Sequence, residues 1–172
     1  AYAGQLGGAD ILVNNAGIMF EQSIEDMTED DWDRMMIVNM RAPVFLAKAV
    51  LRQMRAKDGG SIINIGSIEG LGANTSHVAY CGSKAAVHGF SRALAVDLGA
   101  AHIRCNAIAP GWINSDLSND YINAQQDPKQ AWQDLSALHP IGRTGEPSDI
   151  GKMVVFLASE DAGFITGQVF VI

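Results

Sequence analysis

The sequence predicts an α/β fold, in which a parallel β-sheet carries helices on both of its faces. Short apolar runs rich in β-branched residues, typical of buried strands, alternate along the chain with longer segments of helical pattern. Strand–helix–strand units of this kind form crossovers, and successive crossovers build a parallel sheet. With 172 residues, 48% of them hydrophobic, we expect 1–172 to be a single domain with its own core.

Local signals give the elements in order. Residues 2–6 resemble the end of a helix, and a first strand at 11–13 runs into an Asn-Asn-Ala-Gly turn. Thr28 can cap a helix that has an acidic first turn and that runs to about residue 54, ahead of two glycines. The further strands are expected at 62–65, 103–108 and 167–172, and the further helices at 78–98 and at 147–158, where Pro147 takes the first position.

Residues 112–139 form a long polar stretch, which we expect to be irregular apart from a short helix at 129–138. Loops of this length inside a compact domain usually carry function. We therefore interpret 112–139 as a substrate-binding region.

Composition excludes several classes of function. The net charge of −7 gives no basic field for nucleic acid or for an anionic membrane surface, and solubility explains the acidity. There is no apolar run long enough for a membrane span and no signal-peptide pattern. Cys81 and Cys105 lack metal-ligand spacing, so we expect no metal site. These features favour a protein of the reducing cytoplasm.

Tyr80 and Lys84 stand four residues apart, on one face of a predicted helix. A solvent-facing Tyr–Lys pair is the plain alternative. As an acid/base near pH 7, a tyrosine needs about 4 kcal/mol of preferential stabilisation of its phenolate. An ammonium about 4 Å away supplies most of that at an effective dielectric constant of about 20. The pair therefore predicts an acid/base whose pKa Lys84 lowers.

Two further polar residues stand out. Ser67 ends the second strand, thirteen residues before Tyr80, where its hydroxyl can orient a substrate oxygen; a simple turn residue is the alternative. Asn39 interrupts an apolar helix, which favours a buried residue that binds water or backbone over an exposed one. Ser67 and the stretches 14–17 and 110–115 all follow strands, at the edge where parallel sheets bind ligands.

Four motifs resemble those of the short-chain dehydrogenase/reductase family, in the family's order and over nearly the whole chain. They are the segments 7–17, 60–68, 80–84 and 103–111. The resemblance implies a Rossmann-type, doubly wound sheet in three α/β/α layers. It also implies an oxidoreductase that moves hydride between NAD or NADP and a secondary alcohol or ketone.

The same resemblance assigns roles to residues. Tyr80 would be the general acid/base, Ser67 would orient the substrate, Lys84 would also hold the nicotinamide ribose, and Asn39 would keep a water in a proton relay. The expected cofactor-binding residues are Asn15, Ala16, Gly17, Tyr80, Lys84, Pro110, Gly111, Ile113 and Ser115. The expected substrate-binding residues are Ser67, Glu69, His77, Tyr80 and Trp112, with Ile68 and 114–139 also lining the pocket.

Glu69 and His77 hint at a hydroxyl-rich substrate, with surface exposure as the alternative. Two other functions stay open: a relative that catalyses epimerisation or dehydration with the same tyrosine, and a catalytically silent binding subunit. Two helices are apolar on more than one face, which predicts a homodimer or homotetramer. The apolar positions are Phe45, Leu46, Val50, Val87, Phe90 and Leu94.

Some of the family's pattern is absent or altered. The sequence lacks the first strands and the glycine-rich turn that grips the pyrophosphate, and it stops before an expected Asp-Gly-Gly. We therefore expect a partial sequence with an exposed strand edge, and the choice between NAD and NADP stays open. Gly66, Gly82 and Ser115 replace commoner residues without removing a reacting group, and we interpret them as family variation.

Overall fold

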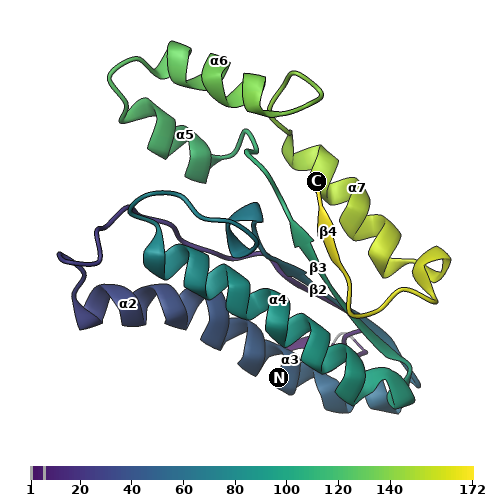
Figure 1. Ribbon diagram of the computed structural model, residues 1–172. Coiled ribbons are helices and arrows are strands. Elements are labelled where there is room, and N and C mark those ends of the chain that lie inside the picture. The colour runs from purple at the N-terminus through teal and green to yellow at the C-terminus, as the bar shows by residue number, and fades with distance from the viewer. Residues whose placement is uncertain (1, 6) are drawn as a thin grey trace.

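The computed structural model describes residues 2–5 and 7–172, and its described part contains one parallel sheet of four strands (Figure 1). The strands are β1 (Ile11–Asn14), β2 (Gly60–Ile65), β3 (Ile103–Ala109) and β4 (Val169–Val171). They lie in the order β1-β2-β3-β4, and every neighbouring pair is parallel. The predicted α/β class and parallel sheet are confirmed.

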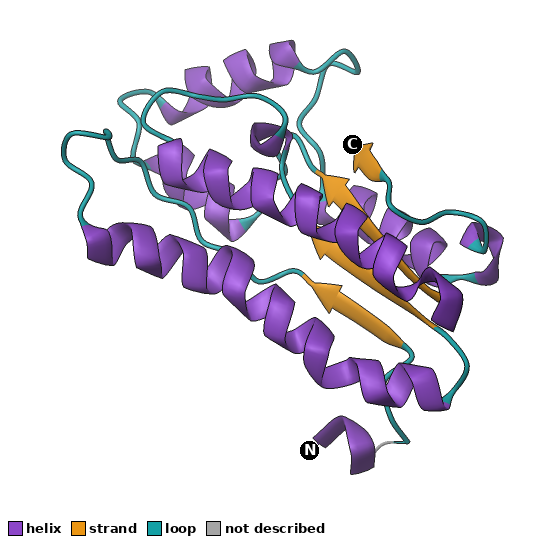
Figure 2. Ribbon diagram, turned by 60° about the horizontal axis from the view of Figure 1, so that its bottom comes forward, coloured by secondary structure: helices purple, strands orange, loops and turns teal. Residues whose placement is uncertain are grey.

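Helices cover both faces of the sheet and make three layers. Helices α3 (Ala42–Ala56) and α4 (Val78–Leu98) lie across one face, as Figure 2 shows, and α7 (Pro147–Ala158) lies on the other. Ile62 and Ile63 point to opposite faces of β2, and neither is accessible to solvent. A strand buried on both sides is typical of parallel sheets in α/β proteins.

Each face has its own apolar core. One core, between the sheet and α3 and α4, contains Ala47, Met54, Ile62, Ala95, Leu98, Ile103 and Cys105. The other, beneath α7, contains Ile63, Ile108, Leu157 and Ala162. On that second face the edge strand β1 leaves Ile11 49% and Val13 39% exposed, as we expected for this edge.

The long predicted helix after Thr28 is interrupted in its middle. Thr28 and Asp31 form a capping box at the start of α2 (Glu29–Met36), a π-helical turn follows at Ile37–Arg41, and α3 then continues to Ala56. Pro43 explains the interruption: it has no N–H to donate, and its ring excludes the carbonyl one turn earlier. The chain widens there, and the Ala42 N–H bonds to the Ile37 carbonyl.

The segment 112–139 is more regular than predicted. Besides α6 (Pro128–Leu138), where a helix was expected, it forms α5 (Asp116–Asn123). Most residues of α5 have poor helix propensity, and the side chain of Ser115, at the N-cap position, makes no capping hydrogen bond. Burial of the apolar Ile122 stabilises it instead, and such tertiary packing overrides propensity.

The remaining described elements are short. They are the helix α1 (Tyr2–Gln5) and the 3₁₀ turns η2 (Ile68–Gly70), η3 (Gly99–Ala101) and η4 (Glu160–Ala162). The helix end expected at 2–6 is thus present for residues 2–5, while residue 6 lies outside the described residues. No helix in the described part of the chain is both long and apolar enough to cross a membrane.

Candidate active site

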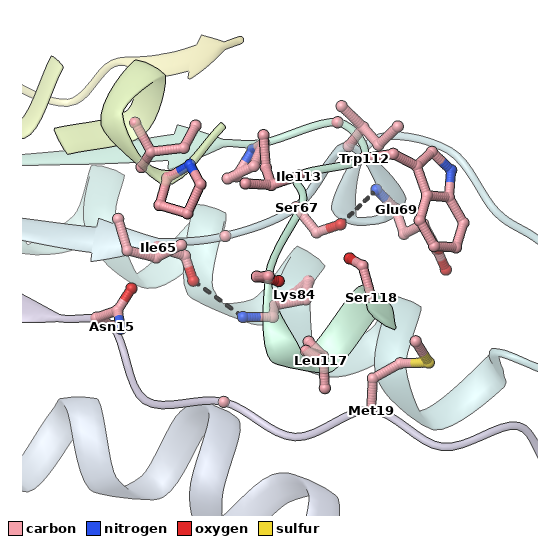
Figure 3. A pocket seen from close by; sticks show the side chains of 18 of the residues that line it. Asn15, Met19, Ile65, Ser67, Glu69, Lys84, Trp112, Ile113, Leu117 and Ser118 are labelled. Carbon is pink, nitrogen blue, oxygen red and sulfur yellow. Dashed lines mark hydrogen bonds between the residues drawn. The ribbon is translucent and has the colours of Figure 1, made fainter. Parts of the chain in front are cut away.

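A cavity of about 540 Å³ opens at the carboxyl ends of the strands. Its walls are the loops after β1, β2 and β3 together with α4, α5 and α7. Most of the residues expected to bind cofactor or substrate line it (Figure 3): Asn15, Gly17, Ser67, Ile68, Glu69, Tyr80, Lys84, Pro110, Gly111, Trp112, Ile113 and Ser115. Ala16, Asn39 and His77 are not among the lining residues.

Backbone hydrogen bonds fix the position of Ser67. Just before it, the Gly66 N–H donates to Ile108 O at 2.7 Å, and just after it the Ile68 N–H donates to Pro110 O at 3.0 Å. These bonds continue the β2–β3 pairing past the end of the strands. Ser67 itself caps η2, because its hydroxyl accepts from the Glu69 N–H at 3.1 Å. The hydroxyl is therefore held at the cavity wall.

Tyr80 and Lys84 lie one turn apart on α4, and both are buried. Burial raises the pKa of Tyr80 to about 12; hydrogen bonding from Ser67 partly offsets this, and the charge of Glu69 adds to it. The Lys84 Nζ donates to Ile65 O at 3.0 Å and lies 5.6 Å from the centroid of the Tyr80 ring. Burial lowers the pKa of Lys84 to about 8.

These values differ from the prediction that Lys84 lowers the pKa of Tyr80. The physical reason is desolvation, which penalises the charged form of each group. It therefore raises the pKa of the phenol and lowers the pKa of the amine. The Lys84 Nζ is also engaged by the Ile65 carbonyl. The phenol of Tyr80 is thus protonated at neutral pH.

Asn39 lies in the π-helical turn, behind the cavity. Its Oδ1 accepts from the Ile18 N–H at 2.9 Å, and its Nδ2 donates to Ile18 O at 2.9 Å and to Ser83 Oγ at 3.0 Å. Of the alternatives predicted for this residue, the structure shows the backbone-bonding one. A side chain at Gly17 would meet both Asn39 Oδ1 and Lys84 Nζ, which explains a glycine at this wall.

Glu69 and His77 form a buried pair. Their side chains meet at 2.7 Å between His77 Nδ1 and Glu69 Oε2, and His77 is only 2% exposed. The pair is therefore not a surface feature. His77, which we expected to bind substrate, is not among the residues that line the cavity, and its ring lies edge-on to the rings of Tyr80 and Tyr121.

Helix α5 closes one side of the cavity. Tyr121 stacks on Trp112 with ring centroids 5.4 Å apart, and its hydroxyl donates to Glu21 Oε1 at 3.1 Å. Sequence reasoning gave no role to several other lining residues: Met19, Ile65, Gly66, Pro147, Ile150, Gly151 and Val154. The signal available for Ile65 and Gly66 was their place beside Ser67 at the end of a predicted strand. Asp116, Leu117 and Ser118 also line the cavity, and they fall within the stretch 114–139 that was expected to do so.

The whole chain, residues 1–172, matches the family model described as "Enoyl-(Acyl carrier protein) reductase". The chain belongs to the short-chain dehydrogenase/reductase family. It is 42% identical over 161 residues to the 3-oxoacyl-[acyl-carrier-protein] reductase of Haemophilus influenzae, covering 94% of this chain and 64% of the relative. It is 37% identical to the (3R)-3-hydroxyacyl-CoA dehydrogenase of Rattus norvegicus, covering 91% of this chain and 59% of the relative.

Two solved structures of the family are similar throughout the chain. A gluconate 5-dehydrogenase from Burkholderia cenocepacia, in complex with NADP and tartrate, has a TM-score of 0.92 at 31% identity, covering 99% of this chain and 66% of that one. An NAD⁺-bound xylitol dehydrogenase has a TM-score of 0.91 at 30% identity, covering 99% and 70%. The chain spans less than two thirds of the length of the curated relatives it matches.

The residues of this family member fit a nicotinamide cofactor. Lys84 uses one of its three N–H donors on Ile65, so two remain for the hydroxyls of a ribose. The bare backbone at Gly17 allows a close approach beside that ammonium. Within the described residues, no group of three His, Cys, Asp or Glu side chains could hold a metal ion.

Proposed function

We propose that the protein is an NAD(P)-dependent oxidoreductase that interconverts a secondary alcohol and a ketone, with Tyr80 as the general acid/base. The observation that carries this proposal is the meeting of Ser67, Tyr80 and Lys84 in one cavity, from separate elements, at the ligand-binding edge of the sheet. The names of the relatives, which are reductases and dehydrogenases of hydroxy or oxo compounds, support the reaction class.

The chemistry follows from the two hydroxyls. In the direction of ketone reduction, the phenol of Tyr80 donates its proton to the carbonyl oxygen while the hydroxyl of Ser67 donates a hydrogen bond to the same atom. In the direction of alcohol oxidation, the phenolate of Tyr80 takes the proton back. The cofactor, when bound, supplies or accepts the hydride. With a pKa of about 12 the phenol of Tyr80 is protonated at neutral pH, which is the form that ketone reduction requires.

The cofactor would be held at the other side of the cavity. Lys84 would bind its ribose hydroxyls, and the wall there is formed by Asn15, Gly17, Pro110, Gly111, Ile113 and Ser115. Ala16 would act only through its backbone. The two similar structures contain NADP in one case and NAD⁺ in the other, so the proposal names NAD or NADP.

The decisive experiment replaces Tyr80 by Phe in the full-length protein. We expect alcohol-dependent formation of NAD(P)H to fall about 10² to 10⁴-fold, the usual contribution of general acid/base catalysis. Tyr121→Phe is the matched control, because it keeps the ring and removes only a hydroxyl, which donates to Glu21 Oε1. If Tyr80→Phe formed NAD(P)H from alcohol at the wild-type rate, the proposed role of Tyr80 would be refuted. If the wild type itself showed no turnover, the alternative of a catalytically silent binding subunit would be favoured.

We also propose that the protein is a cytoplasmic homo-oligomer. Val87 is buried in the monomer, but Phe45 and Leu46 on α3 are 54% and 50% exposed, which is costly unless a partner covers them. Both cysteines are free thiols, which suits a reducing compartment. Light scattering of the full-length protein tests the assembly: Phe45→Glu should yield monomers, whereas a monomeric wild type at micromolar concentration would refute the proposal.

A further inference from the structure

The substrate side of the cavity contains a buried carboxylate beside the reacting position. Glu69 lies two residues after Ser67, lines the cavity and is only 8% exposed. Its backbone N–H holds the Ser67 hydroxyl at 3.1 Å. The charge of its carboxylate also acts on Tyr80, where it raises the pKa of the phenol, so the carboxylate lies near the group that would bind the substrate oxygen.

Neighbouring donors hold this carboxylate in place. Asn74 Nδ2 donates to Oε1 at 2.9 Å, while His77 Nδ1 and Cys81 Sγ contact Oε2 at 2.7 and 3.4 Å. A carboxylate offers about four acceptor positions. These contacts use three of them, so Oε1 keeps one acceptor position for a further donor.

A second polar group faces the same space. Ser118 on α5 is 9% exposed and lines the cavity, and Figure 3 shows its hydroxyl pointing inward, toward the side where Ser67 stands. It makes no side-chain hydrogen bond to any residue that the structure describes. Because it faces the cavity, this hydroxyl is free both to donate to and to accept from a ligand.

The charges of the cavity decide which ligand fits these groups. Lys84 is the only cation among the lining residues, and it lies at the cofactor side, whereas Glu69 and Asp116 are acidic. An anionic group beside Glu69 would be repelled, and a methylene group there would leave the acceptor unpaired. A neutral hydroxyl donates to Glu69 and satisfies Ser118 at the same time.

We propose that Glu69 and Ser118 form a hydroxyl-binding subsite next to the reacting carbon, so that the substrates are neutral polyols and the corresponding hydroxyketones. This inference rests on the proposed function, since it assumes that Ser67 and Tyr80 bind the reacting oxygen. It assigns substrate selection to two residues on separate elements, η2 and α5.

Paired probes that differ by one hydroxyl test the subsite in the full-length protein. Butane-2,3-diol and butan-2-ol are compared by kcat/KM, and the wild type should prefer the diol by about tenfold to hundredfold, the effect of one hydrogen bond to a charged group. Glu69→Leu should reduce that preference to less than about twofold, and Ser118→Ala should reduce it partly. Glu160→Leu, an exposed glutamate outside the cavity, should leave the preference intact.

Two results would overturn the subsite. One is a diol preference that survives in Glu69→Leu and Ser118→Ala; the other is an equal loss of both alcohols in both variants, which would make the residues structural. Should Glu69→Leu fail to fold, Glu69→Gln and Ser118→Ala carry the same comparison.

A measurement without turnover separates this inference from the proposed function. Excess diol should raise the melting temperature of the wild type more than butan-2-ol does, and this difference should shrink in Ser118→Ala and in Glu69→Gln. A wild type that oxidises neither alcohol refutes the proposed function alone. Equal melting shifts for the two alcohols in the wild type refute the subsite.

Discussion

The side chain of Asn39 pairs with the backbone of Ile18 in both directions, accepting from its N–H and donating to its carbonyl, each at 2.9 Å. Ile18 immediately follows the stretch from Asn15 to Gly17 that lines the cavity. The pair therefore ties the cofactor wall to the π-helical turn. An asparagine suits this position because its amide reproduces the donor and acceptor of a neighbouring backbone.

Asn39→Ala should destabilise the protein by about 2 to 4 kcal/mol, because it leaves the N–H and the carbonyl of Ile18 without partners. Urea unfolding measures the loss. Asn39→Asp should not restore stability at neutral pH, since a carboxylate cannot donate to the Ile18 carbonyl. Asn123→Ala, at an exposed position, should change stability by less than about 0.5 kcal/mol. A change of that small size in Asn39→Ala would contradict the pairing.

A second prediction concerns Gly66 and His88. A Cβ atom at Gly66 would overlap with Nε2 of His88, which is buried on α4 beneath the Ser67 loop. Gly66→Ala should therefore destabilise the protein by about 1 to 3 kcal/mol and displace Ser67. His88→Ala makes room, so the double variant should be more stable than the sum of the single effects predicts, by about 1 kcal/mol or more.

Gly89→Ala is the matched control for this cycle. Gly89 lies beside His88 on α4, and a Cβ there meets no atom within 4 Å. Alanine should therefore stabilise this helix position by about 0.5 to 1 kcal/mol. Additive effects of Gly66→Ala and His88→Ala would show that the two residues do not interlock.

How far the sequence predicts this protein depends on which forces act locally. Helix 78–98 was predicted at its observed limits, and the strands were found because β-branched, buried runs are local signals. The turn at Ile37–Arg41 was missed although Pro43 is a local signal for a break in the helix. Helix α5 was missed because it depends on burial against the rest of the protein, which local sequence does not show.

The candidate site shows the same division. Helical spacing placed Tyr80 and Lys84 on one face, and both line the cavity. Spacing carries no information on desolvation, however, so the direction of the Tyr80 pKa was missed. It also could not tell that Glu69 faces the cavity while His77 supports it from behind.

The two free thiols should differ in reactivity. Burial raises the pKa of Cys105 to about 12, so it should react with iodoacetamide only after unfolding. The pKa of Cys81 is raised by burial and by its contact with the Glu69 carboxylate. Glu69→Gln should therefore speed the alkylation of Cys81 at pH 8, as peptide mapping by mass spectrometry would show. An unchanged rate at Cys81 would mean that the carboxylate does not act on the thiol.

Lys84 should oppose stability at neutral pH. Its pKa of about 8, against 10.5 for the free side chain, means that keeping the buried ammonium charged costs about 3 kcal/mol. Between pH 8 and 10 the unfolded chain binds more protons than the folded protein at this residue, so this contribution makes stability rise with pH. Tyr80 makes stability fall as the pH rises, but only above pH 10, where its phenol ionises in the unfolded chain and stays protonated in the folded protein.

Lys84→Met should accordingly be more stable than the wild type at pH 7, by about 1 to 3 kcal/mol, although under the proposed function it should lose turnover. The gain should shrink as the pH approaches 10, because the wild-type side chain is then neutral in the folded protein. Urea unfolding at pH 7, 8, 9 and 10 measures both effects, with the exposed Lys48→Met as control. A variant less stable than the wild type at pH 7 would show that the contacts of the ammonium with Ile65 O and with the Tyr80 ring outweigh its desolvation.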